Sequence, residues 1–219
     1  MSVRELLRNN DERFRVLAAG FSGDEWAQPS LCDAWSNHEV LAHLVIGYRT
    51  GPGVVAAEIL RHRGSFDRAN AAMACSLART HNPGELLDEF ERLVHHPRGL
   101  GRVFPPRLLL GDHITHELDI LFAIDREPTI PLDAVVAVLN TQVTVPNPFV
   151  PAFRNSRGLR LRATDADWAH GTQGPVVEGR AVDLVSVLGN RQRMLSALRG
   201  DGADLLASRV SPRPARTAG

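Results

Sequence analysis

A helical hydrophobic period, which fills the first two thirds of the chain and then stops at a cluster of prolines, constrains the fold most strongly. Apolar residues recur at spacings of three and four, which is typical of amphipathic helices rather than strands. A capping box at Ser36 and Glu39 marks one helix start. We therefore expect an all-helical bundle, with helices over residues 2–20, 36–50, 54–63, 65–80, 83–95, 106–125 and 132–143.

The prolines at positions 146, 148 and 151 end this pattern and predict a linker. Beyond them, residues 158–164 alternate apolar and charged side chains, as a half-buried strand does. A second strand is predicted over residues 175–179, and helices over residues 181–188, 193–198 and 203–210. The predicted fold is mainly α. It has a helical bundle over residues 1–144, a smaller α/β domain over 152–210 and a flexible tail over 211–219.

The charge composition excludes several classes of protein. The chain has 25 basic and 25 acidic residues, so it has no positive field for nucleic acid. Every basic residue except histidine is arginine, which excludes a Schiff-base lysine and the lysine of a phosphate-binding loop. There is no C-x-x-C pair and no apolar run of about 18 residues. We expect a cytoplasmic protein that binds neither nucleic acid nor membrane.

The segment from residue 111 to residue 119 carries the clearest chemistry. On a helix, Asp112 and His116 lie about 6 Å apart on one face, and a carboxylate and an imidazole at this spacing can chelate one metal ion. His113 competes with Asp112 as the partner of His116, and Asp119 is placed to accept the second ring N–H of His116. The alternative interpretation is a solvated helix face stabilised by ion pairs.

His43 is the candidate third ligand. It interrupts an otherwise apolar stretch over residues 40–46, where a buried imidazole needs a partner for each nitrogen. The alternative is a core histidine that is bonded to a carbonyl and a side chain. Cys32, close to Trp35 in the sequence, is either a reactive thiol or a small buried filler.

Taken in order, these residues resemble a known family. The series Trp26, Pro29-Ser30-Leu31-Cys32-Asp33-Ala34-Trp35-Ser36, His43-Leu44 and Asp112-x-x-x-His116-x-x-Asp119 is similar to the DinB-like metalloenzymes of the mycothiol-dependent maleylpyruvate isomerase family. Residues 158–168 and 174–179 resemble the small C-terminal domain of that family. The resemblance covers about residues 5–210, and the lysine-free composition fits an actinobacterial source.

The resemblance implies a DinB-like four-helix bundle in the N-terminal domain. It also implies a divalent metal, usually zinc, that is held by His43, Asp112 and His116. The family has glutamate where this chain has Asp112, and this shorter side chain leaves His113 as an alternative ligand. The resemblance also implies mycothiol as the thiol cosubstrate and a small electrophile as its partner. It makes Arg191 the candidate catalytic arginine of the C-terminal domain; the alternative is that Arg191 caps the helix before it.

Three protein ligands leave an open position on a metal ion, and a thiol bound there is deprotonated. We therefore expect a metal-dependent enzyme that activates a low-molecular-weight thiol for isomerisation of, or transfer to, a small electrophile, and that acts as a monomer or homodimer. One alternative is a non-catalytic ligand-binding or regulatory protein on the same fold. Another is a non-haem iron enzyme, because two histidines and one carboxylate also suit iron and oxygen chemistry.

Overall fold

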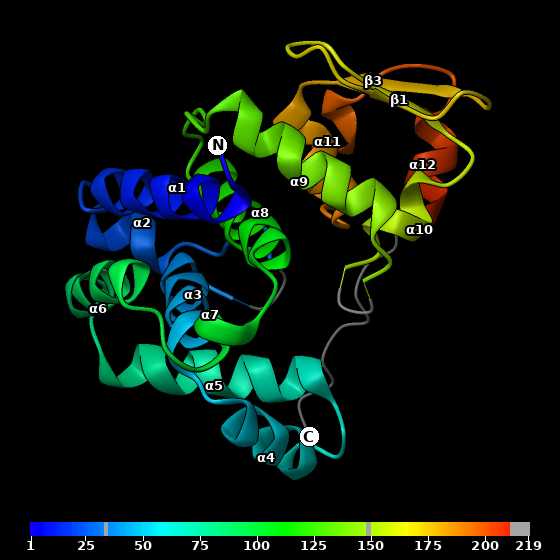
Figure 1. Ribbon diagram of the computed structural model, residues 1–219. Coiled ribbons are helices and arrows are strands. Elements are labelled where there is room, and N and C mark those ends of the chain that lie inside the picture. Colours follow the sequence, from blue (N-terminus) through cyan, green and yellow to red (C-terminus); the bar gives the residue numbers. More distant parts are fainter. Residues whose placement is uncertain (33–34, 148–149, 211–219) are drawn as a thin grey trace. The chain divides into compact units, whose positions relative to one another are not determined.

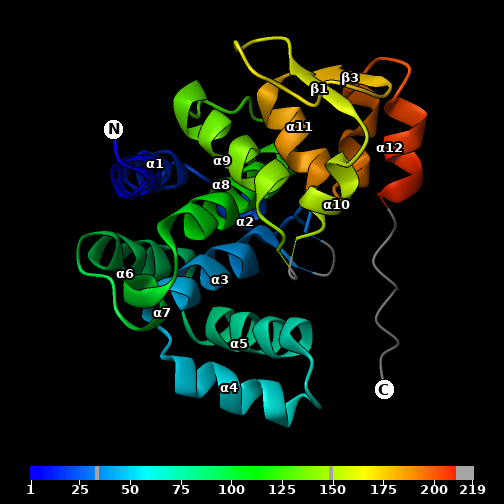
Figure 2. The same cartoon turned by 45° about the vertical axis from the view of Figure 1, so that its right-hand side comes forward.

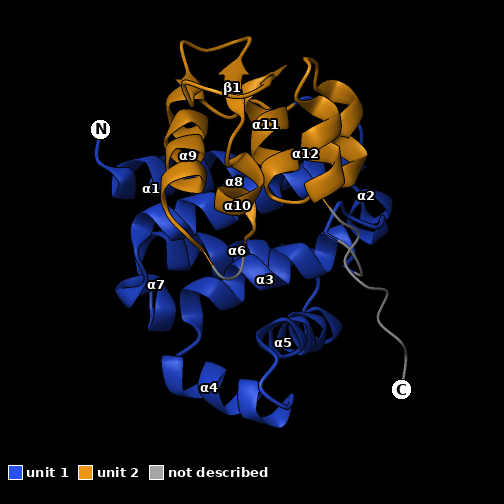
Figure 3. Ribbon diagram, turned by 90° about the vertical axis from the view of Figure 1, so that its right-hand side faces the viewer, with its two compact units in different colours: residues 1–127 blue, residues 128–219 orange. Residues whose placement is uncertain are grey.

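The computed structural model describes residues 1–32, 35–147 and 150–210, and it is mainly helical with one small sheet (Figure 1). The tail expected over residues 211–219 lies outside the described residues. The chain divides into two compact units, residues 1–127 and residues 128–219 (Figure 3). Within the described residues, no helix combines the length and the apolar character needed to cross a bilayer.

The first unit is entirely helical in its described residues. Its elements are α1 (Val3–Ala18), α2 (Gly23–Ala27), α3 (Asn37–Arg49), α4 (Pro52–Arg61), α5 (Phe66–Thr80), α6 (Pro83–His95), α7 (Gly99–Val103) and α8 (Pro106–Ala123). The longer helices agree with the predicted ranges within a few residues. The short helices α2 and α7 were not predicted, because five residues are too few to show a helical period.

Capping boxes set the starts of α1, α2, α3 and α6 in this unit. In a capping box, a side chain accepts a backbone N–H three residues ahead and the third residue's carboxylate accepts the cap's own N–H, so two N–H groups gain partners. The box predicted at Ser36 and Glu39 is confirmed at the start of α3. The same arrangement begins α1, α2 and α6, at Ser2, Ser22 and Asn82.

Four helices, α1, α3, α6 and α8, pack as the predicted bundle (Figures 1 and 2). Helices α1 and α3 each contact both α6 and α8, and α5 packs against α3. Phe14 of α1 and Phe90 of α6 meet edge to face at 6.2 Å, alongside the buried Leu41 of α3 and Ile120 of α8. Each such buried side chain contributes roughly 1.5–3 kcal/mol of transfer free energy, so the core fixes how α3 lies against α8.

The second unit contains the small sheet. Its elements are α9 (Leu132–Thr144), α10 (Ala152–Ser156), β1 (Arg160–Ala163), β2 (Ala169–His170), β3 (Val176–Gly179), α11 (Ala181–Leu188), the 3₁₀ helix η1 (Gln192–Ala197) and α12 (Ala203–Arg209). The strand order is β2-β1-β3, with β1 antiparallel to β2 and parallel to β3. Leu161 of β1 is buried while Arg160 and Arg162 are exposed, which confirms the alternation read from the sequence.

The unit boundary differs from the sequence-based expectation. The sequence predicts residues 1–144 as one bundle, whereas α9 belongs to the second unit and packs against α10 and α11. Asn140 of α9 accepts a hydrogen bond from the indole of Trp168, and Gln142 donates to the carbonyl of Val185. A hydrophobic period shows that a helix forms but not which neighbour its apolar face covers.

A buried ion pair joins α1 to α8. Glu117 of α8 has no exposed surface, and its two carboxylate oxygens accept hydrogen bonds from Arg13, one of them at 2.6 Å, and one accepts from Asn10 at 3.2 Å. Burial raises the pKa of Glu117 to about 7, against the opposing effect of Arg13 and Asn10. The negative charge of the buried Glu117 carboxylate is therefore compensated mainly by Arg13.

We expect Arg13→Ala to lower the free energy of unfolding by about 3–5 kcal/mol, because it leaves a buried carboxylate without its cation. The matched control is Arg15→Ala on the same helix. Arg15 pairs at 2.8 Å with Glu91, whose side chain is 48% exposed, so its loss should cost less than about 1 kcal/mol. Urea denaturation of both variants measures the free energy of unfolding. Equal losses in the two variants would show that the buried pair contributes no more to stability than the exposed one.

Candidate metal centre

Three side chains from two bundle helices converge in the first unit. His43 lies on α3, and Asp112 and His116 lie one turn apart on α8. The Nε2 atom of His43 is 3.2 Å from Oδ2 of Asp112, and Nε2 of His116 is 3.6 Å from Oδ1 of Asp112. Their ligand atoms all lie within 4.8 Å of one another. The structure thus brings together the three residues that the sequence analysis selected.

The second nitrogen of each imidazole has its own partner. Nδ1 of His43 is 3.0 Å from the amide oxygen of Asn70 on α5, and Nδ1 of His116 is 3.0 Å from the carboxylate of Asp119. Both partners are acceptors, so each Nδ1 carries the proton and donates it, which leaves the lone pair of each Nε2 facing Asp112. The Asp119 contact was predicted from spacing. The Asn70 contact was not, because no motif marks an asparagine in an ordinary helix.

The electrostatics of the cluster suit a cation. Burial lowers the pKa of His116, against the opposing effect of Asp112 and Asp119. Burial opposes ionisation of Asp112, but His43 and His116 outweigh it and hold the pKa of that carboxyl below its usual range. The ring of Trp35 packs against both imidazoles, with its centroid 5.1 Å from that of the His43 ring and 5.8 Å from that of the His116 ring. Imidazole nitrogens and a carboxylate oxygen are donors that divalent metals take, so the residues fit such an ion.

His113 does not join this cluster. Its Nδ1 lies 2.9 Å from the carboxylate of Asp11 on α1, and the hydroxyl of Tyr48 donates to the same carboxylate at 2.5 Å. One residue of rotation along α8 is enough to turn His113 toward α1 instead of α3. The geometry therefore favours Asp112 over His113 as the third ligand.

Two other sequence candidates are not part of the set formed by His43, Asp112 and His116. Cys32 is buried, with its sulfur among the neighbours of His116 and Asp119. Arg191 lies in the second unit after α11, and its guanidinium donates to the carbonyl of Gly189 at 2.6 Å. That contact is the helix-capping role given as the alternative for Arg191, and its catalytic role stays a prediction.

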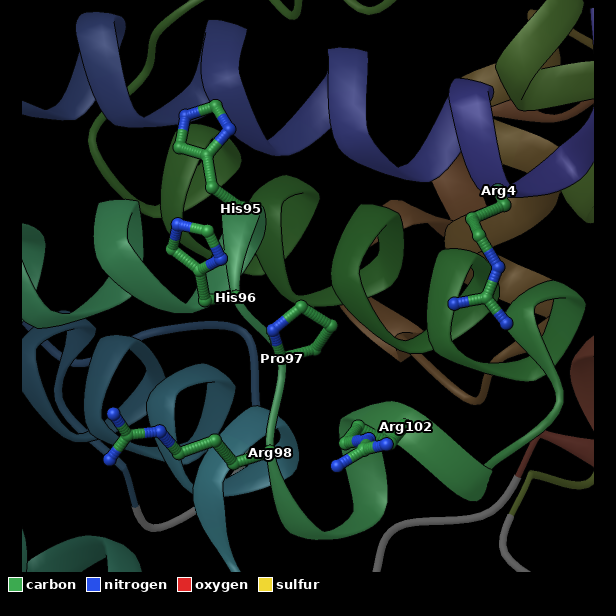
Figure 4. A pocket seen from close by; sticks show the side chains of 6 residues that line it. All are labelled: Arg4, His95, His96, Pro97, Arg98 and Arg102. Carbon is green, nitrogen blue, oxygen red and sulfur yellow. The ribbon is translucent and has the colours of Figure 1, made fainter.

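A separate hollow of about 450 Å³ in the first unit has a different character. Figure 4 shows Arg4 and Arg98 at opposite sides of it, with side chains that do not point to a common centre. No metal-competent residue of the cluster lines it; its lining is Arg4, His95, His96, Pro97, Arg98 and Arg102. The hollow offers positive charge without a converging set of donors, so the cluster on α3 and α8 is the candidate site.

Comparisons with known proteins agree with this fold. Residues 7–107 match the family model described as the mycothiol maleylpyruvate isomerase N-terminal domain. The chain is also similar to a crystal structure of a histidine-to-alanine mutant of the mycothiol-dependent maleylpyruvate isomerase, with a TM-score of 0.58 at 12% identity over 92% of each chain. A crystal structure titled as the same isomerase gives a TM-score of 0.54 at 15% identity over 92% of each chain. Among curated proteins, no match is found.

At these identities, the solved structures establish the fold. The family model adds sequence evidence for the part of the bundle that contains Trp35 and His43. Residues 7–107 of this chain, a little under half of its length, are therefore similar to the mycothiol maleylpyruvate isomerase N-terminal domain.

Proposed function

We propose that this protein is a metal-dependent enzyme that activates a low-molecular-weight thiol, mycothiol, for isomerisation of or transfer to a small electrophile. The observation that carries the proposal is the convergence of His43, Asp112 and His116, whose ligand atoms lie within 4.8 Å of one another. The names of the matching domain and of the two similar structures, which specify mycothiol and an isomerase, support the choice of thiol and reaction.

The protein's own residues prepare the site for this chemistry. His43, Asp112 and His116 would hold the ion, and zinc suits two imidazoles with one carboxylate. A divalent ion there would supply the positive charge that keeps a bound thiol deprotonated. Asn70 and Asp119 hold the ring protons at Nδ1, away from the cluster. The side chain of Asp112 is 35% exposed, so the cluster is reachable from its side.

The structure also bears on the alternative of a non-catalytic binding protein. A missing metal ligand or a site closed to a thiol would favour that alternative. Here the candidate ligand atoms of His43, Asp112 and His116 lie within 4.8 Å of one another, and the side chain of Asp112 is 35% exposed. This arrangement supports the proposal of an enzyme. The proposal further includes a catalytic role for Arg191, a cytoplasmic location and a monomeric or homodimeric state.

The first test is metal content. We expect one divalent ion per chain, and we expect His43→Ala to weaken zinc affinity by more than about 100-fold, since even loss of a residue that only orients a ligand costs about 10–100-fold. Inductively coupled plasma mass spectrometry on protein expressed without added metal, followed by zinc titration calorimetry, measures both. Iron in place of zinc would favour the non-haem iron alternative.

A surface histidine supplies the control. The ring of His62 is 3.8 Å from Glu58 and has no place in the cluster, so His62→Ala should bind zinc as the wild type does. Equal zinc affinity in the His43→Ala variant and the wild type would contradict the metal site.

The second test concerns Asn70. We expect Asn70→Leu to lower zinc affinity about 10–100-fold, because the isosteric side chain cannot accept the Nδ1 proton of His43. Asn70→Asp keeps an acceptor at the same place and should retain most of the affinity. If the two variants weakened binding equally, the role assigned to the Asn70 oxygen would be wrong.

The third test is activity. The protein should isomerise maleylpyruvate in the presence of mycothiol, and prolonged dialysis against a chelator should abolish this activity until zinc is returned. Product formation followed by chromatography, with glutathione as the control thiol, gives the readout. Full activity after verified metal removal would refute metal dependence, and absence of turnover with a panel of electrophiles would favour the binding protein.

A further inference from the structure

A second set of metal-ligating side chains lies on the other side of the His116 ring. Cys32, His116 and Asp119 each offer one ligand atom, and these atoms all lie within 4.8 Å of one another. All three residues are buried, with exposed fractions of 8%, 8% and 1%. Ligand atoms around a tetrahedral zinc-sized ion are about 3.5 Å apart, from bond lengths of about 2.0–2.3 Å. Small side-chain shifts are therefore enough to close this set around an ion.

Backbone hydrogen bonds hold Cys32 against α8. The N–H of Leu31 donates to the carbonyl of Asp119 at 3.1 Å, which ties the segment directly to the helix. The N–H of Cys32 donates to the hydroxyl of Ser30 at 3.1 Å, and the N–H of Trp35 donates to the carbonyl of Cys32 at 3.1 Å. The position of the thiol beside Asp119 is thus set by the fold of the chain around it.

The two ring nitrogens of His116 face different ligand sets. Nε2 lies 3.6 Å from Asp112, and Nδ1 lies 3.0 Å from Asp119. A neutral imidazole carries one proton, so only one of its nitrogens has a free lone pair at a time. With the proton on Nδ1, Nε2 can bind an ion together with His43 and Asp112. With the proton on Nε2, Nδ1 can bind an ion together with Cys32 and Asp119.

We propose that Cys32, His116 and Asp119 form a second metal site for a soft divalent cation such as Cd²⁺, and that this site and the His43 site exclude each other because they share His116. Soft ions prefer a thiolate sulfur to a ligand set that offers only nitrogen and oxygen, such as His43, Asp112 and His116. As the metal–sulfur bond forms, the Cys32 thiol releases its proton to solvent. The ring proton of His116 leaves Nδ1 and Nε2 gains one, so one proton is released for each ion bound. No oxidant or reductant takes part.

The experiment is a Cd²⁺ titration of the full chain after metal removal, followed by the ultraviolet thiolate-to-cadmium charge-transfer band. We expect the band in the wild type and in Cys75→Ser, and its loss in Cys32→Ser. Cys75 is the matched control, since it is the other cysteine and belongs to neither ligand set. Loss of the band in Cys75→Ser and its survival in Cys32→Ser would overturn the proposal.

Two further measurements separate this site from the first. His43→Ala removes only the first ligand set, so its band should persist even if the proposed enzyme function fails. In wild type loaded with Co²⁺, each Cd²⁺ that binds and gives the charge-transfer band should release one Co²⁺. If one chain held both ions at once, the mutual exclusion would be overturned.

¹¹³Cd NMR of the wild type reports sulfur coordination directly, so the proposal stays testable if Cys32→Ser does not fold. A ¹¹³Cd chemical shift typical of nitrogen and oxygen ligands alone would refute the proposal.

Discussion

The packing of α3 against α8 is the contact on which the candidate centre depends. It brings His43 to Asp112 and His116, although 69 residues separate His43 from Asp112 in the chain. Apolar residues supply the energy of this packing, since Leu41, Leu44, Ile120 and Leu121 are all buried in one core. The polar cluster is thus held by a hydrophobic interface, and the metal-ligating geometry does not depend on the ligands attracting one another.

Helix α8 shows how much polarity this interface tolerates and how that polarity is compensated. His113, His116, Glu117 and Asp119 are all buried on the same helix. Two of them have partners on α1, since Asp11 pairs with His113 and Arg13 donates to Glu117, while His116 and Asp119 pair with each other within α8. A buried polar group without such a partner costs several kcal/mol. The pairs made by His113 and Glu117 therefore help to specify that α1 lies against α8.

This arrangement explains what could be read from the sequence. The capping box at Ser36 sets where α3 begins, and the four-residue spacing of Asp112 and His116 places both on one face, so these local features were predictable. The partners of His43 and His113, Asn70 and Asp11, come from helices distant in sequence, and no local pattern points to them. For the same reason the sequence groups α9 with the bundle, whereas α9 packs against α10 and α11, because its apolar face alone does not identify α11 as its neighbour.

The two imidazoles of the cluster differ in the group behind them, and this difference gives them different roles. Asn70 presents a neutral amide oxygen to His43, so the proton on Nδ1 of His43 stays there. Asp119 presents a carboxylate to His116, which strengthens the hydrogen bond and makes the ring more electron-rich. In the two proposed metal sites, His43 is therefore the fixed donor and His116 the adjustable one, so competition between the sites is expected to act through His116.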